Sequence, residues 1–442
     1  MKNTKKKQNV KIRVVKHSFT GGNITKYSGL NVVAKFMNRQ KISQNLGGLF
    51  PTVFYNATKF STAQILMSCI LASHAGINRI SRIANFTQDP LVKVNLRLKK
   101  AINENAISGK LKQLGQKGAR MLQDFLLSHK SRQLKNSGLK DITLDADSTV
   151  SITYGNQEGA EKGFNTKKKG AKSYHPLLVF VSELKMLYHT WFRSGAAHTA
   201  NGITEFLKEV KSYLPETIEN VFFRADSGYF SGKLFDLLEA YNWDYLVKVK
   251  LKNLKQLLEK QDWAQVGGLK DVWSCEFYYT AKSWNGTRRK FKAVKSIKGY
   301  VEKDFFGKKE LVPVYQYACY ASSYKNKSAM ELHEIYKRRS TSETWIEEVK
   351  SQHLAGKTLT GDFWANDILW QLSCFAYNIS VLMRTKHKGL RRQEHKTFRD
   401  WFILVPGKVV NSGHRTEIRI YENYYCKSNW LEFDEFLDTV QA

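Results

Sequence analysis

The few acidic residues are the first place to look for chemistry in this 442-residue chain, which carries 71 Lys and Arg against only 39 Asp and Glu. Asp147 follows a segment rich in β-branched residues, and Asp226 ends the apolar run 221–225 before a Ser-Gly turn. A carboxylate at the carboxyl end of a strand lies where a mixed sheet offers an open site. Each aspartate alone is also compatible with an ordinary turn or helix cap.

A further set of polar residues lies on one predicted helix, residues 331–350. Its members are Tyr336, Arg339, Glu343 and Lys350, at spacings of three, four and seven. At about 3.6 residues per turn, positions 336, 343 and 350 fall on one stripe with Arg339 close to it. One helix face therefore carries a carboxylate flanked by two cations and a phenol. An exposed face stabilised by pairing of Arg339 with Glu343 would explain the same pattern.

Taken together, the two aspartates and the polar residues of the predicted helix resemble the motifs of a known family. The Tyr-(2)-Arg-(3)-Glu-(6)-Lys pattern from 336 to 350 matches the signature of cut-and-paste insertion-sequence transposases of the DDE class. The stretches 144–149 (LDADST) and 224–229 (RADSGY) look like that family's first and second aspartate boxes. Other stretches similar to one subgroup are 154–160, 173–177, 363–366 and 376–378. The resemblance covers about residues 20–430.

The resemblance implies a metal-dependent active site. It assigns Asp147, Asp226 and Glu343 as the carboxylates that hold two Mg²⁺ ions, with Mn²⁺ as a substitute. Hard divalent ions prefer oxygen ligands, and a paired-metal site activates the attacking water or 3′-hydroxyl. The DNA phosphates near the scissile bond would be held by Tyr336, Arg339 and Lys350.

The first aspartate has a rival two residues earlier. Asp145 and Asp147 lie on the same face of the predicted strand because side chains alternate with a period of two. We favour Asp147, since in the family a small residue and Thr follow this aspartate, as Ser148 and Thr149 do here. Asp145 remains the alternative, with a supporting or solvent-facing position as its plainer interpretation.

Strands that alternate with helices from residue 141 onward predict a mixed sheet covered by helices. The stretch 273–324 lacks helical periodicity and predicts a mainly antiparallel insert. The resemblance implies an α/β fold with a ribonuclease H-like catalytic core and a β-rich insertion, preceded by a mainly helical, basic DNA-binding region. The expected segments are the DNA-binding region at 1–138, the first part of the core at 139–250, the insertion at 251–325, and the last part of the core with the C-terminal region at 326–442.

Individual elements are predicted from periodicity and from Gly and Pro breaks. The expected strands are 141–152, 174–184, 185–192, 219–225 and 245–249, and the expected helices are 203–214, 232–241, 331–350 and 363–384. Helical periodicity over 61–135 includes short segments at 80–85, 90–100 and 108–114. These could form a helix-turn-helix that places one basic helix in a DNA major groove, although short helices with glycine turns are common.

Positive charge is concentrated in the N-terminal third. Residues 1–140 hold 26 basic and three acidic side chains, a net charge of +23 out of +32 for the whole chain. Such a region is attracted to nucleic-acid phosphates through counterion release. The lysines at 2, 5, 6 and 7 form its basic tip. A solvated, solubilising face is the plainer explanation, but the excess also runs through amphipathic segments, which favours DNA binding.

Aromatic and basic residues also gather in the predicted insertion. Trp273 and Trp284 lie near Arg288 and Arg289 and could stack on a base extruded near the cleavage point. We therefore include Trp284, Arg288 and Arg289 among the candidate DNA-binding residues. Packing within the insertion is the plainer explanation, above all for Trp273.

Several classes of protein are disfavoured by the sequence. Five widely spaced cysteines without a C-x-x-C motif predict buried thiols in a reducing compartment rather than a disulfide framework. The longest apolar run, 65–72, is far shorter than the roughly 20 residues of a membrane-spanning helix. Zincin, P-loop and dinucleotide-binding motifs are absent from the sequence.

The function expected from these observations is that of a DNA transposase. It would bind the terminal inverted repeats of its element and pair two ends as a homodimer. It would then cut the ends through a hairpin intermediate, as related members do, and join the 3′ ends to target DNA. We expect a cytoplasmic, nucleoid-associated bacterial protein. The alternatives are a DNA-binding repressor or domesticated transposase without strand-transfer activity, and a nuclease that cuts without joining.

Overall fold

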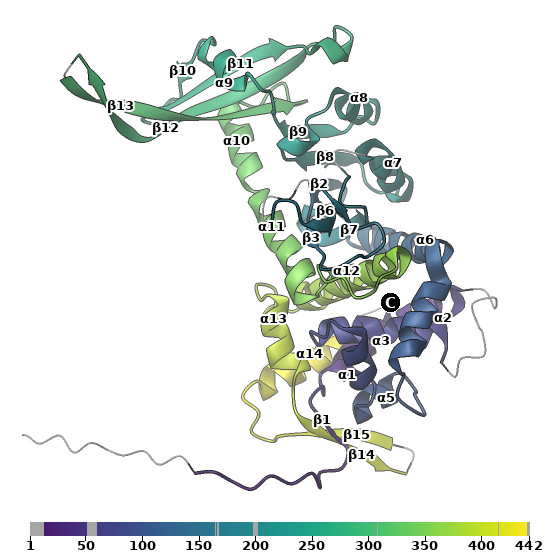
Figure 1. Cartoon of the computed structure of the whole chain (residues 1–442). Helices are drawn as coiled ribbons and strands as arrows, with labels where there is room; N and C mark the ends of the chain where they lie inside the picture. Colours follow the sequence, from purple (N-terminus) through teal and green to yellow (C-terminus); the bar gives the residue numbers. More distant parts are fainter. Residues whose placement is uncertain are drawn as a thin grey trace, which may run out of the picture.

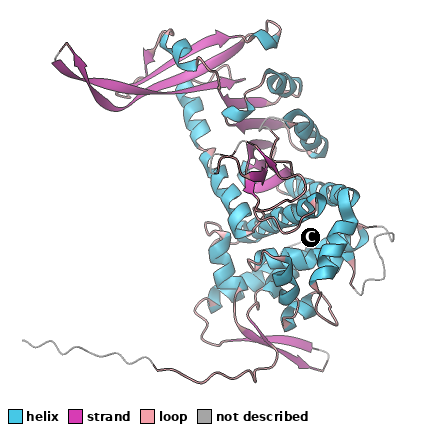
Figure 2. Ribbon diagram, viewed as in Figure 1, coloured by secondary structure: helices cyan, strands magenta, loops and turns pink. Residues whose placement is uncertain are grey.

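The computed structural model describes residues 13–50, 60–163, 165, 168–197, 202–306, 308–413 and 415–439. The basic tip with lysines 2, 5, 6 and 7 lies outside this part of the chain. Helices dominate the two ends of the described chain and strands dominate its middle (Figure 2).

A mixed sheet of nine strands, in the order β10-β11-β12-β13-β9-β8-β2-β6-β7, is the largest sheet of the described residues (Figure 1). The neighbours β2, β8 and β9 are parallel, and the other strand pairs are antiparallel. The bounds are β2 Asp141–Ser148, β6 Leu177–Val181, β7 Met186–Trp191, β8 Asn220–Ala225, β9 Asp244–Lys248, β10 Ala264–Gln265, β11 Val272–Tyr279, β12 Arg289–Phe305 and β13 Lys308–Ser322. Helices α7 (Ile203–Tyr213), α8 (Gly232–Ala240) and α9 (Leu254–Glu259) connect strands of this sheet.

Most strands and helices predicted for the core are confirmed to within a few residues, but two predicted strands are wrong as continuous elements. The stretch 141–152 divides into β2 and the separate β3 (Ser151–Ile152), which pairs with β5 (Lys172–Tyr174) in a small sheet with β4 (Glu161–Lys162). The stretch 174–184 divides at Pro176 into β5 and β6. Proline has no N–H to donate to a strand ladder, which explains the second break.

The β-rich insertion is continuous with the core sheet. Its last strand, β13, pairs antiparallel with β9 through Tyr320–Lys248, Ala321–Val247 and Ser322–Leu246. Strands β12 and β13 form a long hairpin whose far end extends away from the N-terminal and C-terminal helices (Figure 1). The sheet therefore links the insertion directly to the strands that carry Asp147 and Asp226.

Six helices precede the sheet in the described chain: α1 (Leu30–Arg39), α2 (Ile42–Gly48), α3 (Thr62–His74), α4 (Ile80–Phe86), α5 (Pro90–Asn95) and α6 (Glu104–Asn136). Asp89 caps α5 by accepting hydrogen bonds from the N–H groups of Leu91 and Val92. The short helix predicted at 108–114 is wrong, because these residues belong to the long helix α6, which kinks at Gly115 where φ is 53°.

The long helix α12 (Phe363–Lys386) lies between two parts of the hydrophobic core. One face contributes Ile368, Leu372 and Ile379 to the cluster formed by the N-terminal helices and the C-terminal segments. The opposite face contributes Trp370 and Tyr377 to a cluster with β6 and β7. The C-terminal segments are α13 (His395–Phe398), α14 (Lys427–Thr439), and β14 (Gly407–Ser412) with β15 (Arg415–Ile420), which form a small sheet with β1 (Ile24–Thr25).

The N-terminal helices are thus not packed as an independent unit. The hydrophobic cluster that includes residues of α1, α3 and α6 also includes residues of α12, and Phe433 and Leu437 of α14.

All five cysteines are free and buried, which confirms the prediction of buried thiols without disulfide bonds. Within the described residues, no helix has the length and apolar character that a membrane crossing requires.

Candidate active site

Two of the predicted carboxylates lie side by side at the ends of parallel strands. The last paired residues of β2 and β8 are Ala146 and Ala225, so Asp147 and Asp226 come next on adjacent strands. Burial raises the pKa of Asp147 to about 6, and the charge of Asp226 adds to this shift. The nearness of a second carboxylate disfavours ionisation because like charges repel. A bound cation would relieve this repulsion.

Asp226 also caps the turn that follows its strand, which is the local role that the sequence left open for it. Its Oδ1 accepts a hydrogen bond from the N–H of Gly228 at 2.9 Å and caps the short 3₁₀ turn Ser227–Tyr229. This bond fixes the carboxylate at the strand end. The capping role therefore helps to position the side chain at the site.

The rival carboxylate, Asp145, is fully buried in an ion pair. Its two oxygens accept hydrogen bonds from Nε and Nη2 of Arg224, both at 2.8 Å, and Oδ2 also accepts one from the hydroxyl of Ser182 at 2.8 Å. Because this bidentate pair already occupies both oxygens, Asp145 is unsuited to metal binding here. The arrangement favours Asp147 as the first carboxylate and gives Asp145 a structural role.

Arg224 also connects the sheet to the helix that precedes Arg339. Its Nη1 donates a hydrogen bond to the backbone carbonyl of Ile335 at 2.8 Å. Ile335 lies in α10 (Ala329–Lys337), directly before Tyr336. Arg224 therefore ties the two aspartate-bearing strands to the helix that carries the third set of site residues. The sequence showed this arginine in the second aspartate box but not its role.

The helix predicted at 331–350 is wrong as a single regular helix. It consists of α10, α11 (Ser340–Glu347) and a π-helical turn, Glu348–Gln352. The break after Lys337 and the π turn alter the angular spacing that 3.6 residues per turn would give. Tyr336, Arg339 and Glu343 nevertheless line one pocket with Asp226, whereas Lys350 does not line it.

Arg339 lies between the helix and the aspartates. Its Nη2 is 2.9 Å from Oδ2 of Asp147 and donates a hydrogen bond to the carbonyl of Ala146 at 3.2 Å. The side chain is buried, with 7% of its surface exposed. In the described part of the chain it pairs with Asp147 and not with Glu343, so the simple helix-face pairing considered above is not what the structure forms.

Tyr336 lies close to all three predicted carboxylates. Burial raises the pKa of its phenol, and the negative charges of Asp226, Asp147 and Glu343 raise it further, whereas Arg339 opposes the shift. The Tyr336 hydroxyl therefore stays protonated and able to donate at neutral pH. Tyr229 has a similar environment, since burial and the two aspartates raise its pKa well above the usual value.

The third carboxylate is near the pair but not in contact with it. Glu343 is exposed on α11 and lines the same pocket as Asp226. The oxygens of Asp147, Asp226 and Glu343 do not all lie within 4.8 Å of one another, since the only group of three possible metal ligands at that spacing among the described residues consists of histidines. The structure thus places Asp226 and Glu343 on one pocket and Asp147 beside Asp226, without bringing the three acids to ligand distance.

Lys350 lies in a neighbouring groove. Its Nζ donates a hydrogen bond to the carbonyl of Val150, just after β2, at 2.9 Å. The groove, with a volume of about 910 Å³, is also lined by Arg79 at the start of α4 and by Lys357. Lys350 therefore connects the first aspartate strand to a basic groove beside the N-terminal helices.

Two of the three candidates in the insertion are committed to packing. Trp284 is buried among aromatic rings that include Phe230 and Phe291. The guanidinium of Arg289 pairs with Glu239 at 2.8 Å and with Asp236, both on α8. These contacts hold the insertion against α8 and leave no exposed ring face or guanidinium for DNA.

Arg288 differs from its two neighbours in the insertion. It is exposed and lies over the ring of Tyr278, which is itself 61% exposed, at 5.4 Å from the ring centroid. This pair is available to a ligand such as DNA.

Comparisons with known proteins were made for sequence and for structure. A family model described as transposase DDE domain group 1 matches residues 7–441. Among solved structures, the chain is similar to the piggyBac transposase synaptic complex with hairpin DNA, with 12% identity, a TM-score of 0.46, and coverage of 84% of this chain and 76% of that chain. It is also similar to the Mos1 transposase paired-end complex with left transposon end, with 12% identity, a TM-score of 0.18, and coverage of 43% and 59%. No curated protein matches the sequence.

Proposed function

Since this chain belongs to the transposase DDE domain group 1 family, we propose that it binds the terminal inverted repeats of its element, cuts the ends and joins their 3′ ends to target DNA. The observation that carries the proposal is the meeting of Asp147 and Asp226 at the ends of two adjacent parallel strands. Glu343 shares a pocket with Asp226. These are the acidic residues that the motif spacing predicts.

The donor atoms at this site suit divalent metal ions. The family generally uses such ions, and oxygen ligands are those that Mg²⁺ and Mn²⁺ prefer. Burial is the main cause of the raised pKa of Asp147, and the negative charge of Asp226 adds to it, so a bound cation would favour the ionised carboxylate. We propose that Asp147, Asp226 and Glu343 hold two Mg²⁺ ions. When bound, the ions supply an activated oxygen nucleophile and neutralise the leaving oxygen.

The neighbouring side chains hold and orient the DNA in this proposal. Arg339 fixes Asp147 through its ion pair, and its guanidinium lines the pocket where a scissile phosphate would lie. Tyr336 donates a hydrogen bond from its protonated hydroxyl. Lys350 and Arg288 contact the phosphate backbone farther from the cut, in the basic groove and on the insertion. Positioning and charge supply most of the rate enhancement in phosphoryl transfer.

The larger parts of the chain have matching roles. We propose that the strands β7-β6-β2-β8-β9 form a ribonuclease H-like catalytic core, with the strand-rich segment 251–325 as its insertion. The helical region within 1–138, where basic residues exceed acidic ones most strongly, would bind the inverted repeats. Two copies would pair the ends as a homodimer, and cleavage would pass through a DNA hairpin.

The test is cleavage of labelled inverted-repeat DNA in Mg²⁺ by the full chain and by Asp226→Ala and Glu343→Ala. We expect both variants to lose nicking and joining. Glu347→Gln, an exposed acid on the same helix α11, serves as the matched control and should cut like the parent. Variants that retain full cleavage would refute the assignment. Cleavage without plasmid joining by the parent would favour a nuclease, and DNA binding alone would favour a repressor or domesticated transposase.

A further inference from the structure

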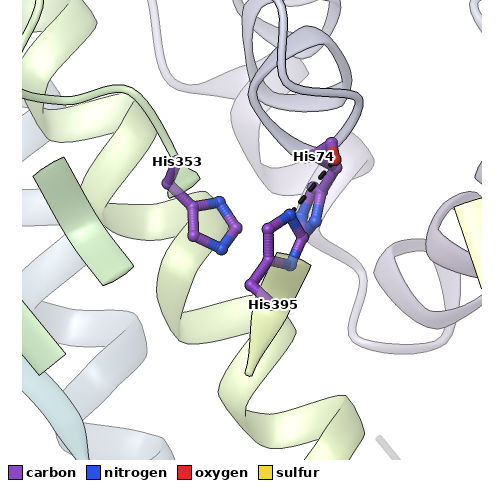
Figure 3. Close-up of side chains that lie close together, drawn as sticks. All are labelled: His74, His353 and His395. Atoms are coloured by element: carbon purple, nitrogen blue, oxygen red, sulfur yellow. Dashed lines mark hydrogen bonds between the residues drawn. The ribbon is translucent and has the colours of Figure 1, made fainter. Parts of the chain in front are cut away.

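Three histidines from distant parts of the chain meet in the interior (Figure 3). His74 is the last residue of α3, His353 follows the π turn after α11, and His395 is the first residue of α13. One ring nitrogen of each lies within 4.8 Å of the others, and no other group of three possible ligands in the described chain meets this spacing. All three side chains are fully buried.

Hydrogen bonding leaves this cluster unsatisfied. Both ring nitrogens of His74 and Nε2 of His353 are buried without a hydrogen-bond partner. A buried polar atom without a partner costs about 1–3 kcal/mol, so native proteins rarely keep several together. Within this part of the fold, the unsatisfied nitrogens gather at one point between three segments. Such an arrangement fits a ligand that accepts nitrogen lone pairs.

The third histidine is oriented as metal-bound histidines commonly are. Nε2 of His395 donates to the backbone carbonyl of His74 at 3.1 Å, which requires Nε2 to carry the proton. Nδ1 then carries the lone pair and accepts a hydrogen bond from the hydroxyl of Ser380 at 2.8 Å, a bond that an ion at Nδ1 would replace. A ring N–H donated to a backbone carbonyl fixes the tautomer and the ring orientation of a ligand histidine.

We propose that His74, His353 and His395 bind a Zn²⁺ ion. Neutral imidazole is a preferred zinc ligand, with Zn–N distances of about 2.0–2.1 Å in tetrahedral geometry. That geometry places ligand nitrogens about 3.3 Å apart, so the present spacing closes by a shift of roughly 1.5 Å or less, within reach of side-chain rotation. Three protein ligands leave the fourth position to a water or a nearby hydroxyl such as that of Ser380.

Burial and the positive charges around the cluster keep the histidine rings neutral, but those charges also repel a cation. Burial lowers the pKa of His74 to about 3 and lowers the pKa of His353 and His395 well below the usual value, and the positive charges of Arg384 and Arg399 add to these shifts. A metal binds the neutral form of imidazole, and the ring nitrogens of His74 and His353 without hydrogen-bond partners are the atoms that this cluster offers to it. The same arginines repel a cation, but Glu348 balances Arg384 through a 2.6 Å ion pair.

A bound ion would cross-link three parts of the chain that the fold brings together. His74 belongs to the N-terminal helices, His353 lies three residues after Lys350, and His395 belongs to the C-terminal segment. Zinc at this point would fix the helix of Glu343 and Lys350 relative to the N-terminal helices. This role is structural and independent of the proposed chemistry at the aspartates.

The experiment measures metal bound by the full-length protein after chelation, dialysis and addition of ZnCl₂. We expect about one Zn²⁺ per chain by elemental analysis in the parent, and loss of that zinc in His353→Gln and in His395→Gln. His129→Gln is the matched control, because His129 is also buried but lies outside the cluster. Zinc should raise the melting temperature of the parent and of His129→Gln only.

Cobalt supplies a readout that needs no variant. Co²⁺ added to the metal-free parent should produce the visible absorption bands of tetrahedral nitrogen coordination, and added Zn²⁺ should remove them. Parent protein that takes up no zinc and shows no such bands would overturn the proposal. Zinc uptake that is the same in the parent and in folded His353→Gln and His395→Gln would overturn it as well. None of these results depends on whether the protein cuts DNA.

Discussion

Asparagine substitutions at Asp145 and Asp147, two residues apart on one strand face, should have opposite effects on stability. Asp145 forms a buried bidentate pair with Arg224. Removing one partner of a buried pair leaves the other charge uncompensated and costs about 3–5 kcal/mol. For a chain of this size, with an unfolding entropy of about 2.1 cal/mol/K per residue, that loss corresponds to a melting temperature lower by roughly 3–5 °C.

In the absence of metal, the negative charge of Asp147 destabilises the folded protein, in contrast to the paired charge of Asp145. Its pKa is raised from 3.8 to about 6, and its side chain is 17% exposed. A shift of about two pKa units means that keeping the charged form at pH 7 costs roughly 3 kcal/mol. Asp147→Asn removes this cost but weakens the contact with Arg339. We therefore expect stability unchanged or increased by up to about 3 kcal/mol, together with loss of DNA cleavage.

The assay is thermal unfolding followed by circular dichroism in EDTA, beside Mg²⁺-dependent cleavage in parallel samples. Asp141→Asn, at an exposed position of the same strand β2, controls for the substitution itself. A fall in melting temperature for Asp147→Asn as large as that for Asp145→Asn would refute the reasoning. Cleavage retained by Asp147→Asn and lost by a folded Asp145→Asn would make Asp145 the first carboxylate.

Three further outcomes follow from the contacts described. Arg339→Lys keeps the charge but loses the forked geometry, so single-turnover cleavage should fall roughly 10- to 100-fold, and an unchanged rate would contradict a positioning role. Trp284→Ala should destabilise the protein by about 3–5 kcal/mol in urea unfolding, whereas a loss of DNA affinity at unchanged stability would restore the base-stacking role. Burial lowers the pKa of His129 to about 4, so this residue contributes stability that is present above pH 6.5 and lost as the pH falls toward 4. His129 alone should account for about 2 kcal/mol of the fall in the free energy of unfolding between pH 7 and 5, beside what other buried histidines contribute, and His129→Gln should reduce that slope.

The positions of the acidic residues in the fold could be predicted because they depend on local pattern. The apolar run before Asp226 marks a buried strand, and the sheet pairs it with β2 so that both aspartates reach the same edge. The register between the two strands follows from which faces are buried. Residue types and period were therefore sufficient to place each aspartate at the end of a strand, whereas a site shared by the two was what the family resemblance implied.

The interruption of the third element was not predictable in the same way. Tyr336 and Glu343 have a helical spacing, and the segment is helical, but α10 ends at Lys337 and the chain passes through a π turn before His353. Tertiary contacts override the regular period here: Arg339 turns to Asp147, and Lys350 reaches the carbonyl of Val150. No pattern within the helix specifies those partners.

Roles that depend on long-range contacts could not be predicted for the same reason. The neighbours of Arg289 and Trp284 in the sequence made both residues candidates for DNA contact. In the fold, acidic residues of α8 pair with Arg289, and aromatic rings of α8 and the insertion enclose Trp284. The meeting of His74 with His353 joins residues from opposite ends of the chain. Only the packing of α3, α12 and α13 brings such residues together.

The most direct test of the central claim is the metal dependence of cleavage by Asp226→Cys and Glu343→Cys. Thiolate is a poor ligand for Mg²⁺ but a better one for Mn²⁺, so substitution of a true metal ligand changes which ion supports the reaction. We predict that both variants lose cleavage of inverted-repeat DNA in Mg²⁺ and regain a measurable part of it in Mn²⁺. Full cleavage in Mg²⁺, or no recovery in Mn²⁺ by correctly folded variants, would contradict metal binding by these carboxylates.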